Sequence, residues 1–332
     1  MMAARRLTAA ALGVLAVTAW AIAAPAQPAQ NEPAKKVNDA ATPANPEPSN
    51  PKVDLAYGAF QRGYYLTALK EATERAEKND PQAMTLIAVL YAQGLGVGRD
   101  DVKAAHWYTL AAKRGDPDAM FALAMLYFAG RGVKRDEKEG IKLLEQAANL
   151  NHPLAQYDLG LIYLRGKQVL QDLKRAAELF AAAAKSGSAA AQYALATLYR
   201  EGRGVPKDQK KAMQLMGKAS VAGNLDAMTE YAIAQFNGDG VPKNEPAAAE
   251  LFLRAARRGS AVAQDRLARI LMAGRGMAAN PTQAIKWHLI AKAGGDNDPE
   301  LDVFAAKQPQ EVRDAAKAAA KKWLSTATAL HP

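Results

Sequence analysis

The sequence predicts an all-α fold: an α-solenoid of stacked antiparallel helix hairpins, with capping helices at both ends. Three observations carry this prediction. Glycines recur every 36 residues, alanines and valines recur with the same step in other registers, and the chain is rich in alanine, which favours helices. The recurring glycines are Gly94, Gly130, Gly166, Gly202, Gly238 and Gly274. Six 36-residue repeats follow, at 80–115, 116–151, 152–187, 188–223, 224–259 and 260–295.

Residues 1–26 have the pattern of a secretory signal peptide. Arg5 and Arg6 precede an uncharged apolar run of 18 residues, and small residues allow cleavage after Ala23 or after Ala26. An uncleaved anchor is the alternative, because this run lies near the lower limit of the roughly 17–25 residues that span a bilayer. We expect a periplasmic or secreted protein with no stable membrane span after cleavage.

The next two segments lead into the repeats. Residues 27–52 hold six prolines and very few residues that a core would bury, which predicts a disordered Pro/Ala-rich linker. Residues 53–79 have helix-like alanine spacing and a final Asn79, which predicts an N-terminal capping hairpin.

Each repeat carries the signals of two helices. The first helix follows a residue that suits an N-cap in five of the six repeats, namely Asp80, Asp116, Ser188, Asn224 and Ser260, with His152 in the third. The second helix follows Asp100, Asp136, Asp172, Asp208, Asn244 or Asn280. It stops at residues that tolerate a left-handed C-cap: Gly115, Asn151, Gly187, Gly223, Gly259 and Gly295.

Small residues indicate where the two helices of a hairpin approach each other. On the first helix they are Ala88, Ala124, Gly160, Ala196, Ala232 and Ala268, and on the second Ala111, Ala147, Ala183, Ala219, Ala255 and Ala291. One hairpin cannot bury its own apolar face, so stability has to come from stacked neighbours.

After the last repeat the register fades. Residues 296–332 predict C-terminal capping helices that begin near Asp298 and Pro309, because a repeat array needs atypical ends with a polar outer face. A basic amphipathic helix in contact with an anionic membrane or a partner is the alternative.

Composition excludes several classes of site. With no cysteine and four histidines, none of which has a second histidine three or four residues on, the chain predicts no metal and no cofactor. Its Gly-x-Gly turns follow helices instead of strands, and its carboxylate pairs lie in first turns, where they stabilise the helix dipole. No nucleophile, base and orienting group share a register, so we expect no enzyme. The net charge of +10 permits an anionic partner, but export argues against nucleic acid.

The predicted binding surface is the first helix of each repeat, which lines the concave groove of a solenoid. There the variable positions include an aromatic strip of Phe121, Tyr157 and Tyr193, with Asp158 and Arg200 beside it and Met125 and Leu161 one turn later. Aromatic anchors with a polar rim are typical of peptide grooves. Packing of the same rings against the neighbouring hairpin is the alternative. A second candidate surface is an edge of Gly-x-Gly arginines, Arg131, Arg203 and Arg275, for an anionic envelope polymer.

The repeat also resembles a known family. The pattern at Ala119–Gly132, Val133 and Asp136, followed by Leu143, Ala147 and Ala148, is similar to the Sel1-like repeat, a relative of the tetratricopeptide repeat. Gln168 and Gln235 depart from it locally, at a turn glycine and a helix tyrosine.

The resemblance implies a function as well as a fold. It implies a scaffold or adaptor that binds a protein or peptide in the groove, and among periplasmic relatives a regulator of a sensor kinase that governs exopolysaccharide production. We therefore expect a non-catalytic interaction protein of the bacterial periplasm. A peptidoglycan- or polysaccharide-associated binding module is the alternative.

Overall fold

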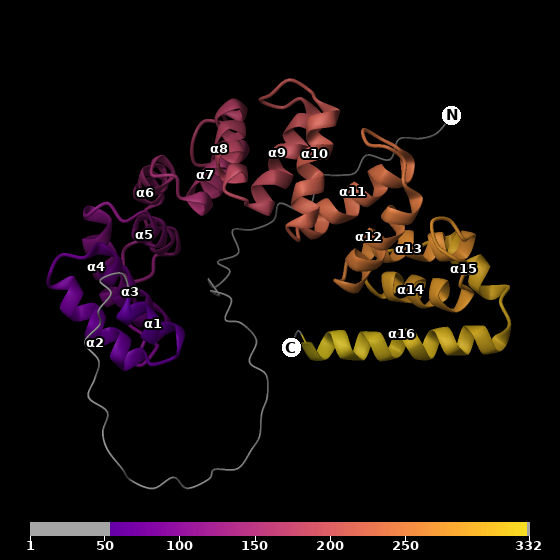
Figure 1. Ribbon diagram of the computed structural model, residues 1–332, viewed down its shortest axis with the longest axis horizontal. Coiled ribbons are helices and arrows are strands. Elements are labelled where there is room, and N and C mark those ends of the chain that lie inside the picture. The colour runs from indigo at the N-terminus through magenta and orange to yellow at the C-terminus, as the bar shows by residue number, and fades with distance from the viewer. Residues whose placement is uncertain (1–53, 331–332) are drawn as a thin grey trace, which may run out of the picture. The chain divides into compact units, whose positions relative to one another are not determined.

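A computed structural model describes residues 54–330, and the side chains of residues 54–326 (Figure 1). Within this range every regular element is an α-helix, and the range contains no strand. The predicted all-α class is therefore confirmed. The predicted signal peptide, residues 1–26, and the predicted linker, residues 27–52, lie outside the described residues.

The chain divides into two compact units between Leu143 and Leu144. The first unit holds α1 (Leu55–Gln61), α2 (Tyr65–Ala76), α3 (Pro81–Gln93), α4 (Asp101–Lys113), α5 (Pro117–Ala129) and the start of α6 (Glu137–Asn149). The second holds the end of α6, α7 (Pro153–Arg165), α8 (Leu173–Lys185), α9 (Ala189–Glu201), α10 (Gln209–Val221), α11 (Leu225–Asn237), α12 (Glu245–Arg257), α13 (Ala261–Ala273), α14 (Pro281–Ala293), α15 (Pro299–Ala306) and α16 (Gln310–Leu330).

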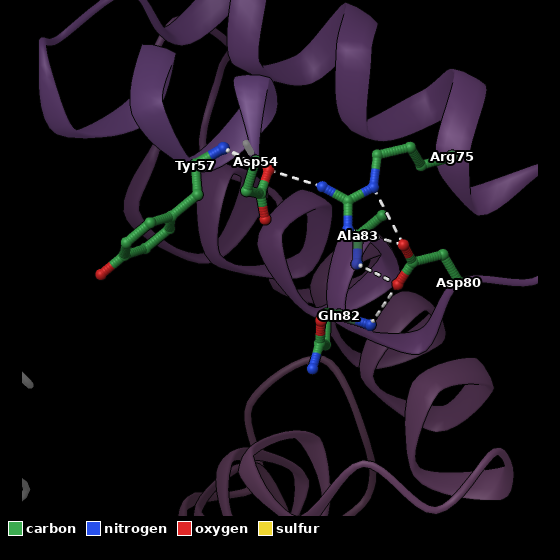
Figure 2. Close-up of polar contacts among 6 residues, drawn as sticks. All are labelled: Asp54, Tyr57, Arg75, Asp80, Gln82 and Ala83. Atoms are coloured by element: carbon green, nitrogen blue, oxygen red, sulfur yellow. Dashed lines mark hydrogen bonds and ion pairs between the residues drawn. The ribbon is translucent and has the colours of Figure 1, made fainter. Parts of the chain in front are cut away.

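In the first unit, Arg75 ties the leading hairpin α1–α2 to the first repeat, as Figure 2 shows. Its guanidinium lies 2.5 Å from Asp54 and donates to Asp80 at 2.6 and 2.9 Å. Both carboxylates are also N-caps: Asp54 accepts the amide of Tyr57 in α1, and Asp80 accepts two first-turn amides of α3. One arginine therefore joins the caps of two helices, so the leading hairpin is fixed against the array at its N-terminal end.

The predicted N-caps of the first helices are confirmed. In every repeat the side chain accepts a first-turn amide, as Asp116 does from Ala119 at 2.9 Å. His152, the one residue outside the usual set, caps α7 by accepting the amide of Ala155 at its Nδ1, at 3.1 Å. This nitrogen can accept only when it carries no proton, so the proton of the neutral ring lies on Nε2.

The Gly-x-Gly turns need their glycines for steric reasons. Both glycines of such a turn have positive φ, and a Cβ on Gly132 would lie 1.9 Å from the carbonyl oxygen of Asp101. The third repeat departs here, as its sequence indicates. Gly166 keeps φ +65, but Gln168 is not among the residues with positive φ, so this turn follows a different backbone path.

In the second unit, each hairpin packs its two helices together, and each second helix packs on the first helix of the next repeat (Figure 1). The predicted small residues lie at these contacts: Ala183, Ala196, Ala219 and Ala255 are fully buried. Gly160 has a specific reason to be smaller still, because a Cβ there would lie 2.7 Å from the ring of Phe180, which is itself buried. The glycine in α7 makes room for the phenylalanine in α8.

A recurring amide ties successive helices of the second unit. Gln156, Gln192 and Gln264 each donate their side-chain NH₂ to the backbone carbonyl eight residues earlier, at 3.1–3.3 Å. These carbonyls lie in the last turn of the preceding second helix, where helical partners are missing. In α11 the register holds Met228, so this contact is replaced there by apolar packing.

The C-terminal end of the second unit is closed by α15 and α16. Figure 1 shows α16, in yellow, running along α14, against which it packs. Ala316 and Ala320 are buried, and the ring of Trp323 meets that of Trp287 with centroids 6.0 Å apart. The apolar stripe of α16 is thus used to cover the last repeat.

Candidate functional site

The candidate site lies on the first helices of the second unit. We define the first-helix face as the surface formed by positions i, i+4 and i+7 of α7, α9, α11 and α13, since these positions share one side of a helix. In α9 they are Tyr193, Thr197 and Arg200, all of which are half-buried. A half-buried row of this kind is held by the core on one side and open to a ligand on the other.

Two predicted residues of this face, Tyr193 and Arg200, are brought together by a carboxylate of the next repeat. The hydroxyl of Tyr193 donates to Glu230 Oε1 at 2.7 Å, and the guanidinium of Arg200 pairs with Glu230 Oε2. Burial, followed by the bond to Glu230, raises the pKa of the Tyr193 phenol. The phenol therefore stays protonated and keeps donating at physiological pH.

Tyr157 occupies the same register in α7 but is arranged differently. Its ring packs against Phe180 with centroids 5.7 Å apart, and it borders the buried cluster around that residue. Its hydroxyl forms no hydrogen bond within residues 54–330, because the position that matches Glu230 is occupied by Ala194. The ring is anchored in the core, and the hydroxyl is available.

Asp158, beside Tyr157, is a half-buried carboxylate that forms no hydrogen bond and no ion pair with the described residues. Burial raises its pKa to about 6, although the positive charge of Arg165 opposes this rise. A carboxylate with this surrounding gains most from a partner that brings a hydrogen-bond donor or a positive charge.

The other predicted groove residues differ in accessibility. Leu161 is only 9% exposed and belongs to the cluster around Phe180, so it contributes to the core. Phe121 and Met125 lie on α5 in the first unit, where both are half-buried. Of the two predicted roles of these aromatic residues, packing is observed: the ring of Tyr157 lies against Phe180, and the ring of Tyr193 packs against the buried cluster around Met216. Partner binding through their hydroxyls stays a prediction.

The three turn arginines all have carboxylate partners. Arg131 donates to Asp101 through two nitrogens, at 2.7 and 3.1 Å, and Arg275 pairs with Glu245 in the same way between neighbouring repeats. Arg203 pairs with Glu201 of its own repeat at 3.3 Å, because Leu173 stands where the other two arginines find an acid. Their charges are largely compensated, which lowers the attraction of this edge for an anionic polymer.

Two charged residues that border the first-helix face, Glu230 and Arg266, were not identified by the sequence interpretation. Both lie in the register of Asp158, which holds Leu86, Ala122 and Ala194 in the other repeats. A charge in a register that is otherwise apolar was the signal that could have identified them.

Residues 54–330 show neither a metal site nor a membrane-spanning helix. No group of three or more His, Asp or Glu side chains in this range is arranged to hold a metal ion. In the same range, no helix combines the length and apolarity needed to cross a membrane.

Comparison with known proteins agrees with this architecture. A family model described as the Sel1 repeat matches six consecutive segments: residues 81–116, 117–152, 153–188, 189–224, 225–260 and 261–296. Each match begins one residue after the repeat boundary predicted from the sequence, at the first helical residue instead of the N-cap. No curated protein is significantly similar to the chain.

Two solved structures are similar to it over most of its length. A Sel1 repeat protein from Oxalobacter formigenes is 29% identical with a TM-score of 0.64, over 72% of this chain and 98% of that one. The protective antigen c5321 of uropathogenic Escherichia coli, which displays an SLR fold, is 25% identical with a TM-score of 0.53. That match covers 79% of this chain and 64% of the antigen.

Proposed function

Because the chain belongs to the Sel1 repeat family, whose repeats generally mediate protein–protein interaction, we propose that it is a non-catalytic scaffold that binds a protein or peptide on its first-helix face. The observation that carries this proposal is the pair Tyr157 and Asp158. On α7, Tyr157 and Asp158 carry a hydroxyl and a carboxylate that form no hydrogen bond with the described residues, one repeat before the linked Tyr193, Arg200 and Glu230. Unpaired polar groups beside anchored aromatic rings are typical of interaction surfaces.

The place of action is part of the proposal. Residues 1–26 have the pattern of a signal peptide, so we propose export to the periplasm, with a mature chain that begins at Ala24 or Gln27. N-terminal sequencing of the protein from its native host tests this. A chain that keeps Met1 contradicts export with cleavage. A role in envelope or exopolysaccharide signalling is the finer part of the proposal, and the identity of the captured partner tests it.

Site-specific photo-crosslinking in cells tests the binding surface. A crosslinking residue replaces Thr197, on the first-helix face, and a matched control replaces Lys210, an exposed residue of α10. We expect one protein to be captured from position 197, not from 210, and capture to fall with Tyr157→Phe and Asp158→Asn. Equal capture from both positions contradicts the proposed surface. Capture of only wall or polysaccharide material favours polymer binding instead.

A further inference from the structure

A pocket of about 270 Å³ lies between α11, α12 and α13 in the second unit. Its apolar lining includes Ile233, Phe236, Phe252 and Ile270. Phe252 and Ile270 are buried, and the rings of Phe236 and Phe252 meet edge to face. This volume is somewhat below the roughly 300–1,000 Å³ of sites for drug-sized ligands, so it suits one medium-sized side chain.

The charged lining of the pocket is entirely basic. Its three charged residues are Arg266, Arg269 and Arg275, and no carboxylate lines it. Arg275 is held from outside by Glu245 and lies over the ring of Phe236, 4.5 Å from its centroid. Arg269 is held by Asp265, Asp298 and Glu300. Arg266 is different: it is exposed, and it has no hydrogen bond or ion pair within the described part of the chain.

The equivalent positions one repeat earlier explain why Arg266 is unpaired among the described residues. Between α9 and α11 the same two registers hold Arg200 and Glu230, which neutralise each other. Thirty-six residues later they hold Phe236 and Arg266. Arg266 thus occupies the position of Glu230, and Phe236 occupies the position of Arg200. The salt bridge is therefore replaced by an apolar pocket that Arg266 lines with an unpaired guanidinium.

We infer that this pocket binds an acidic–apolar segment of the protein partner: a leucine-like side chain enters the pocket, and an adjacent Asp or Glu pairs with Arg266. The inference rests on the proposed function and adds the chemistry of the partner. Charge complementarity selects this occupant. An apolar group alone leaves the guanidinium unpaired, and a basic one meets three arginines. The bidentate geometry of arginine suits a carboxylate.

Selection from a phage-displayed library of random short peptides tests the inference, with the immobilised full chain and its Arg266→Glu variant as parallel targets. We expect the wild-type chain to enrich Asp or Glu beside Leu, Ile, Met or Phe. The charge-reversed variant should enrich Lys or Arg beside the same apolar residues. Arg266 is exposed, so the substitution should leave the fold intact, and the thermal melt of the variant checks this.

A synthetic copy of the enriched peptide then gives the size of the effect. Its affinity should fall about tenfold or more with Arg266→Gln, because the charged pair is lost. It should be abolished by Ala273→Phe, which places a ring at the pocket lining from an exposed position. It should be unchanged by Arg254→Gln, an exposed arginine of α12 outside the pocket.

Four results overturn the inference. The selection enriches no peptide, or both targets enrich the same peptides. The affinity of the synthetic peptide does not change with Arg266→Gln, or hexanoate displaces the peptide at a concentration equal to that of the peptide. The last would show that the pocket takes a small amphipathic anion. Crosslinking from position 197 separates the two proposals. If a partner is captured there and Arg266→Gln does not change its binding, the pocket inference is wrong but the proposed function stands. Peptide selection as expected, with no captured protein in cells, removes the proposed function alone.

Discussion

The hydroxyl of Tyr193 and the carboxylate of Glu230 join two successive repeats through a hydrogen bond of 2.7 Å. Tyr157, one repeat earlier, has the same ring position but faces Ala194 in the place of the acid. The two tyrosines therefore form a matched pair in which one hydroxyl contributes to inter-repeat coupling and the other does not.

This pair gives the first prediction. Tyr193→Phe should lower the free energy of unfolding by about 1 kcal/mol, because Glu230 loses one of its two partners. Tyr157→Phe should be nearly neutral, since its ring stays on Phe180 and its hydroxyl has no bond to lose. Urea unfolding followed by circular dichroism measures both. Equal losses would show that the Tyr193 hydroxyl does not couple the repeats.

Asp158 gives a pH-dependent prediction. Its pKa in the folded chain is about 6, above the ordinary 3.8, so the folded state holds a proton between these values that the unfolded state has released. The free energy of unfolding therefore falls as pH rises through this window, and the penalty is complete above it. Asp158→Asn removes the penalty and should stabilise the chain by about 1–3 kcal/mol at pH 7.5.

The pH profile of the same variant provides the check. The gain from Asp158→Asn should disappear near pH 4, where the native carboxyl is already protonated. Thermal melts at both pH values measure this. A gain of equal size at both would mean that ionisation of Asp158 is not its cause.

Arg75 should show the opposite pH dependence. Burial raises the pKa of Asp80, but its bonds to Arg75 and to the first-turn amides of α3 outweigh this and lower the pKa below the ordinary 3.8. The contribution of the pair to stability is then present above that ordinary value and is lost as pH falls through the folded pKa. Arg75→Gln should cost about 1 kcal/mol at pH 7 and less as the medium becomes more acidic.

Hydrogen exchange locates this effect. Amide protection should fall in α1, α2 and the first turn of α3, where Arg75 joins Asp54 and Asp80, and remain unchanged in α13 and α14. Lys70→Gln, at an exposed position of α2, is the control. Uniform loss of protection along the chain would contradict a local role of Arg75.

Gly160 tests the packing argument. Alanine occupies this register in the other five repeats, yet Gly160→Ala should destabilise the chain by about 1–3 kcal/mol, because the new methyl group meets the buried ring of Phe180. Phe180→Leu should relieve part of that loss. A double-mutant cycle by urea unfolding measures the coupling. Additive losses would show that the two sites do not interact.

The helices and their ends followed from the sequence alone, because caps and turns are local. Asp80 at an N-cap, Asn151 in the left-handed region and the altered turn at Gln168 all depend on a few neighbouring residues. The 36-residue period predicted the stacked array, since each repeat contacts only its neighbours and the role of a position in one repeat predicts its role in the next.

The candidate site depended on the tertiary structure. The partner of the Tyr193 hydroxyl is Glu230, 37 residues away, and the pocket at Arg266 is completed by Phe236, which lies on α11, the first helix of the preceding repeat. Such pairings join side chains of different repeats at distances of a few ångströms. The sequence determined the array, and the tertiary structure decided which of its charges are paired and which are left for a partner, because pairing depends on the contacts between helices and not on the local order of residues.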